Sequence, residues 1–426
     1  MLRVLALRFV FFFMLAAASA QADDALTYVK AGQLIDVLDG EVRSGQVIVI
    51  QDDKIIQVAD AADVQIPPNA MLIDLSGYTV LPGLIDMHDH LTGDHRFHGY
   101  NGLGISVPRE TLYGVFNARK TLNVGFTTVR NVGASGYSDV ALRDAINDGE
   151  IVGPRIRVSG PALGITGGHC DNNLLPPHYG DRAEAVADGP WAVRAKVREV
   201  IKYGADLIKF CATGGVLSKG DSVGGQQYTL EEMQALVDEA HQHERKVAAH
   251  AHGAEGIKTA IIAGVDSIEH GSLIDDEGIR LAKEHGTFLV MDIYNDTFIL
   301  EHGAEVGMLP ESLEKERQIG QLQRDNFRKA FEAGVRMAFG SDGAVYPHGD
   351  NGKQFSYMVE YGMTPMQAIQ AATVHAAELI GWPDAVGAIE AGRFADIIAV
   401  EGNPLDDVAV LEDVRFVMKG GNIYKD

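Results

Sequence analysis

The stretch Leu81-Pro-Gly-Leu-Ile-Asp-Met-His-Asp-His90 decides the fold of this 426-residue chain, because a short apolar run ends there on two histidines. Residues i and i+2 of a β-strand point to the same face, so we expect the imidazoles of His88 and His90 to point the same way. Polar side chains at the end of a buried strand are typical of the catalytic face of a barrel.

Seven further apolar runs of strand length follow this stretch, with helix-like segments such as 229–243 and 311–333 between several of them. The eight candidate strands end within residues 84–88, 127–131, 156–159, 207–209, 247–250, 267–270, 288–291 and 337–341. Eight strands that alternate with helices predict an α/β fold, a closed parallel (β/α)8 barrel of the TIM type over residues 83–387. An open doubly wound sheet is the alternative, but no Gly-rich dinucleotide fingerprint follows any strand.

The two ends of the chain have a different pattern from the middle. Residues 23–82 and 388–426 contain short β-type runs that are separated by turn residues such as Pro67-Pro68 and Gly420-Gly421. Short strands with turns between them predict a small β-sandwich. We expect one sandwich domain built from both termini.

Residues 1–22 have the layout of a signal peptide, with Arg3 and Arg8 near an apolar run and small residues before Asp23. The apolar run is too short to span a bilayer comfortably. We therefore expect a secreted or periplasmic protein without stable membrane anchoring. Cys170 and Cys211 could pair in such a compartment, and the sequence leaves their pairing open.

The charge balance of the chain bears on its partners. It has 36 Lys and Arg against 59 Asp and Glu, which gives a formal charge of −23. Nucleic acids and anionic membranes select basic surfaces, so we do not expect either as a partner. We expect a small-molecule substrate, and the charge of the chain does not exclude an anionic one, because the local field of a pocket can oppose that of the whole chain.

Six ionisable residues fall at the ends of candidate strands, the face on which barrels carry out chemistry. They are His88, His90, Lys209, His250, His270 and Asp342. A single histidine on a strand is more often a satisfied polar group than a ligand, but six residues at equivalent strand ends predict a metal site.

Lys209 needs its own explanation, because an ammonium group cannot bind a cation. It lies between Ile208 and Phe210, and burial lowers the pKa of a lysine. A neutral amine can add carbon dioxide, and the resulting carbamate has two oxygens that can bridge two metals. A lysine in a salt bridge is the simpler alternative, and the five other candidate ligands favour the carbamate.

These residues resemble the amidohydrolase superfamily over essentially all of the mature chain. The resemblance rests on the His-x-His motif, the later ligands and the stretch Gly387-Ala-Ile-Glu-Ala-Gly-Arg-Phe-Ala-Asp396. Lys209-Phe-Cys-Ala-Thr-Gly-Gly215, His250-Ala-His-Gly253 and Ile268-Glu-His-Gly271 are similar to metal-dependent dipeptidases that cleave Xaa-Pro or Xaa-Lys/Arg bonds. The same branch contains bacterial amidases that hydrolyse ochratoxin A. Imidazolonepropionases share the architecture but use one metal and lack the bridging lysine.

The resemblance implies a centre of two divalent metals, most simply two Zn²⁺. His88 and His90 would bind one ion and His250 and His270 the other, with the Lys209 carbamate between them. A hydroxide shared by the two ions would attack the amide carbonyl. Asp342 would bind the first ion, take the proton from the water and pass it to the leaving amine.

Three further residues are candidate substrate contacts. His252 would polarise the carbonyl, with a structural role as the alternative. His169, in a long loop over residues 161–190, could reach a substrate carbonyl or carboxylate, and Tyr228 could donate a hydrogen bond to the tetrahedral intermediate. This loop and the loop over 92–107 are expected pocket walls. The basic residues that could bind a substrate carboxylate are Arg96, Lys219 and Arg245.

The expected substrates are dipeptides and N-acyl amino acids, which include ochratoxin A with release of phenylalanine. The alternatives are a cyclic-amide or nucleobase hydrolase of the same superfamily, and a scaffold homologue without catalysis. All six ligand positions are filled, which argues against the scaffold. The resemblance also implies a homo-oligomer, as large as an octamer in this family.

Overall fold

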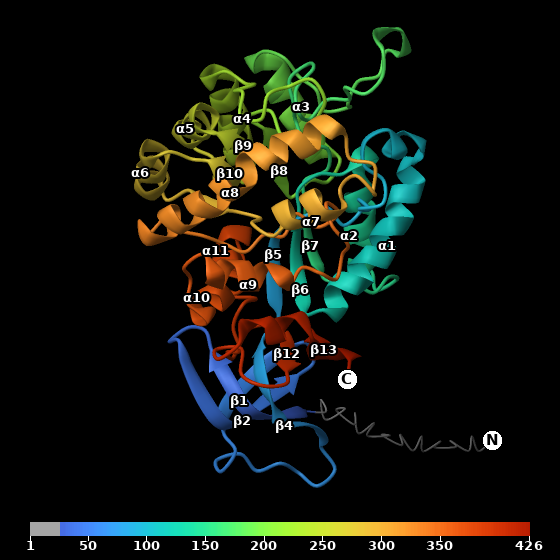
Figure 1. Cartoon of the computed structure of the whole chain (residues 1–426). Helices are drawn as coiled ribbons and strands as arrows, with labels where there is room; N and C mark the ends of the chain where they lie inside the picture. Colours follow the sequence, from blue (N-terminus) through green and yellow to red (C-terminus); the bar gives the residue numbers. More distant parts are fainter. Residues whose placement is uncertain (1–25) are drawn as a thin grey trace, which may run out of the picture.

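The computed structural model describes residues 26–426. The expected signal peptide, residues 1–22, lies outside the described residues. Strands from both ends of the chain form one sheet, which lies below the helical part of the molecule in Figure 1. Its members are β1 (Thr27–Asp36), β2 (Glu41–Gln51), β3 (Lys54–Asp60), β4 (Met71–Pro82), β12 (Ile397–Val400), β13 (Val414–Lys419) and β14 (Asn422–Lys425).

This sheet is continuous across the two ends of the chain, in the order β14-β13-β12-β4-β1-β2-β3. The two ends meet at β4, whose first part runs parallel to β1 and whose last residues pair antiparallel with β12. The strands of the expected sandwich form one hydrogen-bonded order of seven, in which the 12-residue β4 pairs with strands from both ends of the chain. Val29, Ile48, Val80 and Ile397 are fully buried in its core.

The middle of the chain contains seven strands in two parallel sheets. The first sheet consists of β5 (Leu84–Asp89), β6 (Phe126–Asn131) and β7 (Arg155–Val158), and the second of β8 (Leu207–Cys211), β9 (Lys246–Gly253), β10 (Ser267–Leu273) and β11 (Phe288–Val290). Every residue of β5, β6 and β8 is buried, as is typical of parallel strands that are covered on both faces.

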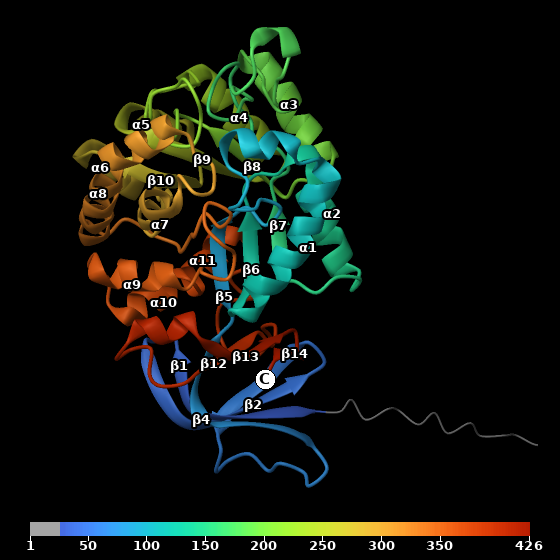
Figure 2. The ribbon, with the colours of Figure 1, turned by 45° about the vertical axis from the view of Figure 1, so that its right-hand side comes forward.

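Helices follow most of these strands and surround them in Figure 2, with α1 and α2 on one side and α5, α6 and α8 on the other. Their bounds are α1 (Val107–Asn123), α2 (Ser138–Asn147), α3 (Pro190–Lys202), α4 (Leu230–Gln242), α5 (Ala254–Ala263), α6 (Asp276–His285), α7 (Asn295–His302), α8 (Pro310–Glu332), α9 (Lys353–Glu360), α10 (Pro365–Ala371) and α11 (Val374–Ile380). The sequence determines the start of α4: Thr229 and Glu232 form a reciprocal capping box there. None of the helices in residues 26–426 is long and apolar enough to cross a membrane.

Backbone hydrogen bonds connect the two parallel sheets at both edges. On one side, the N–H of Asp206, just before β8, donates to the carbonyl of Val158 in β7, and Leu163, beyond β7, exchanges backbone hydrogen bonds with Lys209 and Cys211 of β8. On the other side, the eighth candidate strand, 337–341, forms a single bridge to Leu289 instead of a regular strand, while the Met87 N–H donates to the Phe339 carbonyl. The structure is thus an α/β fold with a separate sheet at one end, and the carboxyl ends of β5, β8, β9 and β10 lie around one cavity.

Candidate metal centre

A cavity of about 770 Å³ lies at the carboxyl ends of the parallel strands. All six residues that the sequence predicts as metal ligands line it. Both long loops contribute to its wall: Thr92 and Val107 belong to the first and Pro161 and Arg182 to the second. The structure therefore brings the strand-end residues together within one concave site.

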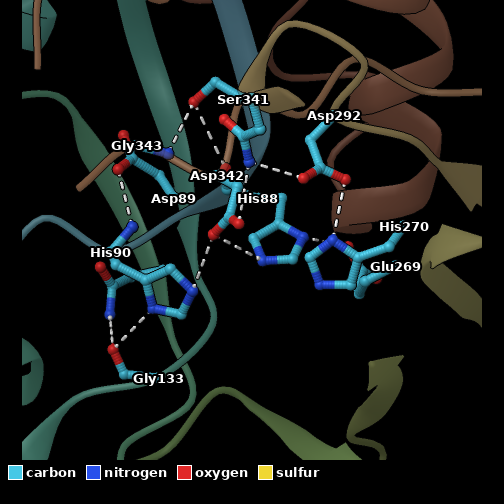
Figure 3. Close-up of polar contacts among 12 residues, drawn as sticks. His88, Asp89, His90, Gly133, Glu269, His270, Asp292, Ser341, Asp342 and Gly343 are labelled. Carbon is cyan, nitrogen blue, oxygen red and sulfur yellow. Dashed lines mark hydrogen bonds and ion pairs between the residues drawn. The ribbon is translucent and has the colours of Figure 1, made fainter. Parts of the chain in front are cut away.

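The first group of candidate ligands consists of His88, His90 and Asp342 (Figure 3). The Nε2 atoms of His88 and His90 each lie 3.3 Å from Asp342 Oδ1. His90 Nδ1 lies 3.2 Å from the Gly133 carbonyl oxygen, which can only accept, so this ring carries its hydrogen on Nδ1. His88 Nδ1 lies 3.0 Å from a carboxylate oxygen of Glu269, which favours the same tautomer.

This arrangement leaves two imidazole lone pairs facing one carboxylate oxygen. Acceptors that face one another need a cation or a proton between them, and two Nε2 atoms with a carboxylate form a donor set that suits a divalent metal. A carboxylate or carbonyl on the other ring nitrogen is the usual support of a metal-binding histidine.

The second group consists of His250, His252 and His270, whose ring centroids lie 4.6 to 4.7 Å apart. His270 donates from Nδ1 to Asp292 Oδ1 at 2.8 Å, so its Nε2 is an acceptor. Among the described residues, His250 Nε2 is buried and has no hydrogen-bond partner. A buried imidazole nitrogen without a partner is costly unless a ligand occupies its lone pair, so the residues of this group also fit a metal ion.

Lys209 is buried at the cavity floor and is charged only at a cost. Burial lowers its pKa to about 8, against the attraction of Glu269 and Asp342 for its charge. A larger fraction of the amine is therefore neutral at pH 7 than in an exposed lysine, and a neutral amine is the form that reacts with carbon dioxide. The two groups of candidate metal ligands that line the cavity with Lys209 are compatible with a carbamate on this residue that bridges two metals.

The residues that hold these ligands in place were not predicted from the sequence. Asp292 accepts from His270, Asn295 and Gln323, and Asn295 also donates to Asp342 Oδ2 at 3.0 Å, which links the two groups. Asp292 directly follows the candidate strand that ends at 291, so the strand-end rule that found the ligands also applies to it.

Glu269 and Arg130 form a second support that the sequence analysis missed. Arg130 Nη2 lies 2.7 Å from Glu269 Oε1, both side chains are buried, and Arg130 also donates to the Met87 carbonyl oxygen and Ser267 Oγ. Although burial raises the pKa of Glu269, the Arg130 charge and His88 hold it well below its ordinary value. The sequence contained a signal for this pair, because a charged residue within each of two apolar parallel strands indicates a buried ion pair.

Two of the candidate ligands have unusual backbone conformations. His270 has φ of 70° and Asp342 has φ of 55°, in the left-handed region that residues with a side chain rarely adopt. Such strain costs on the order of 1–3 kcal/mol for each residue and is concentrated at functional sites. Here it directs both side chains into the cavity at the points where β10 and the segment 337–341 leave the strand geometry.

Two of the three candidate substrate contacts line the cavity, and the third does not. His252 lines the cavity, with Nδ1 2.8 Å from Ser272 Oγ. His169 also lines it, and its ring stacks on His250 with centroids 4.0 Å apart. Burial lowers the pKa of His169 to about 4, so the ring is neutral at pH 7. Tyr228 lies away from the cavity: its hydroxyl donates to the Ala187 carbonyl, and the ring packs in the core.

The three basic residues considered as carboxylate partners also lie outside the cavity lining. Arg96 pairs with Asp94, Lys219 bonds to the Tyr100 hydroxyl, and Arg245 donates to backbone carbonyls. In the described part of the chain, the arginine that lines the cavity is Arg182, from the loop 161–190.

Cys170 and Cys211 form a disulfide, which answers the question that the sequence left open. Their Cα atoms are 5.9 Å apart, within the usual range for such a bond. The disulfide ties the loop 161–190 to the end of β8, two residues beyond Lys209.

Known proteins resemble this chain over most of its length. The model of the amidohydrolase family matches residues 79–424. The chain is 36% identical to the ochratoxinase of Aspergillus niger, an alignment that covers 95% of this chain and 88% of that protein. The crystal structure of that ochratoxinase has a TM-score of 0.85 at 34% identity and covers 94% of this chain and 96% of that chain. A crystal structure of a Xaa-Pro dipeptidase with bound methionine has a TM-score of 0.89 at 42% identity and covers 94% of this chain and 100% of that one.

Proposed function

Because this chain belongs to the amidohydrolase family and is a hydrolytic enzyme that acts on amide bonds, we propose that it cleaves the bond to a C-terminal amino acid. The proposed substrates are dipeptides and N-acyl amino acids, ochratoxin A among them. The relatives named ochratoxinase and Xaa-Pro dipeptidase support this substrate class. A scaffold without catalysis is not favoured by such relatives.

The observation that carries the proposal is the convergence of six ligand-type side chains on one cavity. We propose that His88, His90 and Asp342 hold one divalent metal and that His250 and His270 hold a second, with a carbamate on Lys209 between them. Zinc suits these nitrogen and oxygen donors. Bound metals would supply Lewis acidity and a nucleophilic water at neutral pH.

The residues of this chain then have separate tasks. Asp342, held between His88, His90 and Asn295, is placed to take the proton of the attacking water and to deliver it to the leaving nitrogen. His252 faces the cavity next to His270 and is placed to polarise the substrate carbonyl. Glu269, Gly133 and Asp292 keep the imidazoles in the tautomer that leaves Nε2 free.

The proposal extends to the fold and the location of the protein. The backbone bonds of Leu163 and Phe339 to neighbouring strands support a closed eight-stranded barrel over residues 83–387, with the sheet of 23–82 and 388–426 as a second domain.

The Cys170–Cys211 disulfide supports removal of residues 1–22 and an extracytoplasmic location. Exposed apolar side chains, among them Phe116 and Trp191, support assembly into a homo-oligomer, which light scattering would measure.

A substrate panel tests the function. The protein, supplied with zinc and bicarbonate, is incubated with dipeptides, N-acyl amino acids including ochratoxin A, and hydantoins. Release of the C-terminal amino acid from the first two classes, without opening of hydantoins, is the expected result. Turnover of hydantoins alone would replace this proposal with the cyclic-amide alternative.

A further inference from the structure

The Cys170–Cys211 disulfide lies in the wall of the cavity that contains the candidate metal ligands. Cys211 is the last residue of β8, two residues beyond Lys209, and alternate residues of a strand point to the same face. In the parallel pairing of β8 with β9, the direct partner of Cys211 is His250. The side chains of Lys209, Cys211 and His250 therefore share one face of the sheet, and all three line the cavity.

His250 is a candidate ligand with a free position for a metal ion. Its Nε2 is buried and has no hydrogen-bond partner among the described residues. The backbones of the two strands are joined at this point, because the Ala212 N–H donates to the His250 carbonyl at 2.9 Å. Neighbouring strands lie about 4.8 Å apart, so a metal ion on His250 Nε2 would be within reach of a sulfur from Cys211.

The disulfide keeps this sulfur from acting as a ligand. The described part of the chain has no free cysteine, and the sulfur species that binds metals is the thiolate. A small dithiol could supply the two electrons that break the S–S bond, giving two thiols and a cyclic disulfide of the reductant. Cys170 is partly exposed and lines the cavity, so such a reductant has access to the bond.

The two cysteines differ in how firmly the backbone holds them. Cys211 lies in the buried strand β8, where its N–H donates to the Leu163 carbonyl and where it pairs with His250 on the other side. Cys170 lies in the loop 161–190, which loses its covalent tie to β8 on reduction. Cys211 should therefore keep its place beside His250 after reduction, while Cys170 becomes free to move away.

We propose that the disulfide is a redox switch of the metal centre, whose reduction makes the Cys211 thiol a ligand of the metal ion at His250. The thiol would release its proton to solvent when it binds. A catalytic zinc site needs an open position for water or substrate, and the sulfur would fill it. The reduced protein should thus bind its metal more tightly and turn over more slowly. The inference rests on the metal centre of the proposed function and adds a ligand to it.

Cobalt(II) reports the new ligand directly, because a thiolate bound to Co²⁺ gives a near-ultraviolet charge-transfer absorption that nitrogen and oxygen ligands do not give. The protein is reduced with a water-soluble phosphine, which takes oxygen from water and becomes a phosphine oxide, and is desalted without air. Oxidised and reduced samples are loaded with Co²⁺ in bicarbonate, and their spectra and cobalt content are compared. We expect the absorption only in the reduced protein. Its absence from reduced protein that holds cobalt would overturn the proposal.

Two single variants distinguish the cysteines, since each leaves one free thiol. Cys170→Ser leaves Cys211 free and should show the charge-transfer absorption without any reductant. Cys211→Ser leaves Cys170 free and is the matched control, which should show none. Absorption of equal strength in Cys211→Ser would overturn the assignment to Cys211. If either variant fails to fold, the comparison of oxidised with reduced wild type still decides the proposal.

Metal affinity and kinetics give a second measurement. Cd²⁺ prefers thiolate ligands, so competition with a chelator should show its affinity about tenfold higher in reduced than in oxidised wild type. The double variant Cys170→Ser with Cys211→Ser loses the tie without gaining a thiolate and should bind Cd²⁺ as the oxidised wild type does. The reduced wild type should also have a lower kcat than this double variant. Equal affinity for Cd²⁺ in the two redox states would overturn the proposal.

The cobalt content separates failure of this inference from failure of the proposed function. If neither oxidised nor reduced wild type retains cobalt, the proposed metal centre is wrong, and the switch is overturned with it. If both retain cobalt with identical spectra, the metal centre stands and only the switch is overturned.

Discussion

Arg130 and Glu269 form a buried ion pair beneath the metal centre, with Arg130 Nη2 2.7 Å from Glu269 Oε1 and Glu269 Oε2 3.0 Å from His88 Nδ1. The pair therefore connects the interior of the parallel sheets to a candidate metal ligand. Its stabilising role and its functional role can be separated by substitution.

Replacement of Arg130 by Met should destabilise the protein by about 3–5 kcal/mol, because it leaves the Glu269 carboxylate buried without its partner. The double variant Arg130→Met with Glu269→Leu should recover most of this loss, since removing both charges of a buried pair is often neutral. It should not recover metal affinity, because His88 loses the group that orients it. Urea unfolding and zinc competition with a chelator measure the two effects. Equal recovery of stability and affinity would show that Glu269 does not act on His88.

The disulfide should matter both to activity and to folding. Reduction of Cys170–Cys211, or the variant Cys170→Ser with Cys211→Ser, should raise KM several-fold, because the loop that holds His169 loses its tie to β8. The cost in stability should be about 2–4 kcal/mol, as expected for a loop of this length. Kinetics with and without dithiothreitol measure the effect, and the double Ser variant serves as the control that dithiothreitol should not change. An unchanged KM after reduction would show that the remaining contacts of His169 suffice.

Lys209→Ala should abolish turnover and lower zinc content, because the proposed bridge between the two metal groups is removed. Acetate or formate at high concentration should restore part of the activity, since a free carboxylate can occupy the position of the carbamate. Lys202→Ala, at the end of α3 and outside the cavity lining, is the matched control and should leave zinc content unchanged. Full zinc occupancy in Lys209→Ala would contradict the bridging role.

Glu316, in the cavity wall, should make the protein less stable as the pH rises. Burial and the neighbouring negative charge of Asp296 raise the pKa of Glu316 to about 8. The folded protein then binds more protons than the unfolded chain between about pH 4.5 and 8. The contribution of Glu316 to the free energy of unfolding should therefore fall by up to about 1.4 kcal/mol per pH unit as the pH rises across that window.

Glu316→Gln keeps the shape of the side chain and cannot ionise. The variant should match the wild type near pH 4.5 and exceed it in stability at pH 8, measured by urea unfolding at both values. Glu314→Gln, an exposed position on the same helix, provides the comparison. A difference between wild type and Glu316→Gln that does not change with pH would contradict the raised pKa.

The sequence predicted the candidate ligands because strand geometry determines their position. A strand alternates its faces and parallel strands end on one side, so His88, His90, His250 and Asp342 could be assigned to one cavity from spacing alone. Tyr228 shows the limit of that reasoning. It follows a strand on the same side, but the direction of its side chain depends on Ala187, which is 41 residues away in the chain.

The hydrogen-bond partners were harder to predict because they come from distant segments. The ring of His169 contacts Ser218, which in turn contacts Asp221, and nothing in the local sequence pattern of these two residues marks a contact with a loop about 50 residues earlier. The strand order of the sheet at the end of the molecule was also not predicted. Strand runs at each terminus were visible, but their order in the sheet depends on how far β4 extends, which is decided by pairing with β12.

The pairing of β4 with β12 also has a consequence for how the chain is made. Ile397 lies beside Pro82, so the N-terminal strands have no partner on that edge until nearly the whole polypeptide has left the ribosome. Completion of the sheet is therefore a post-translational event.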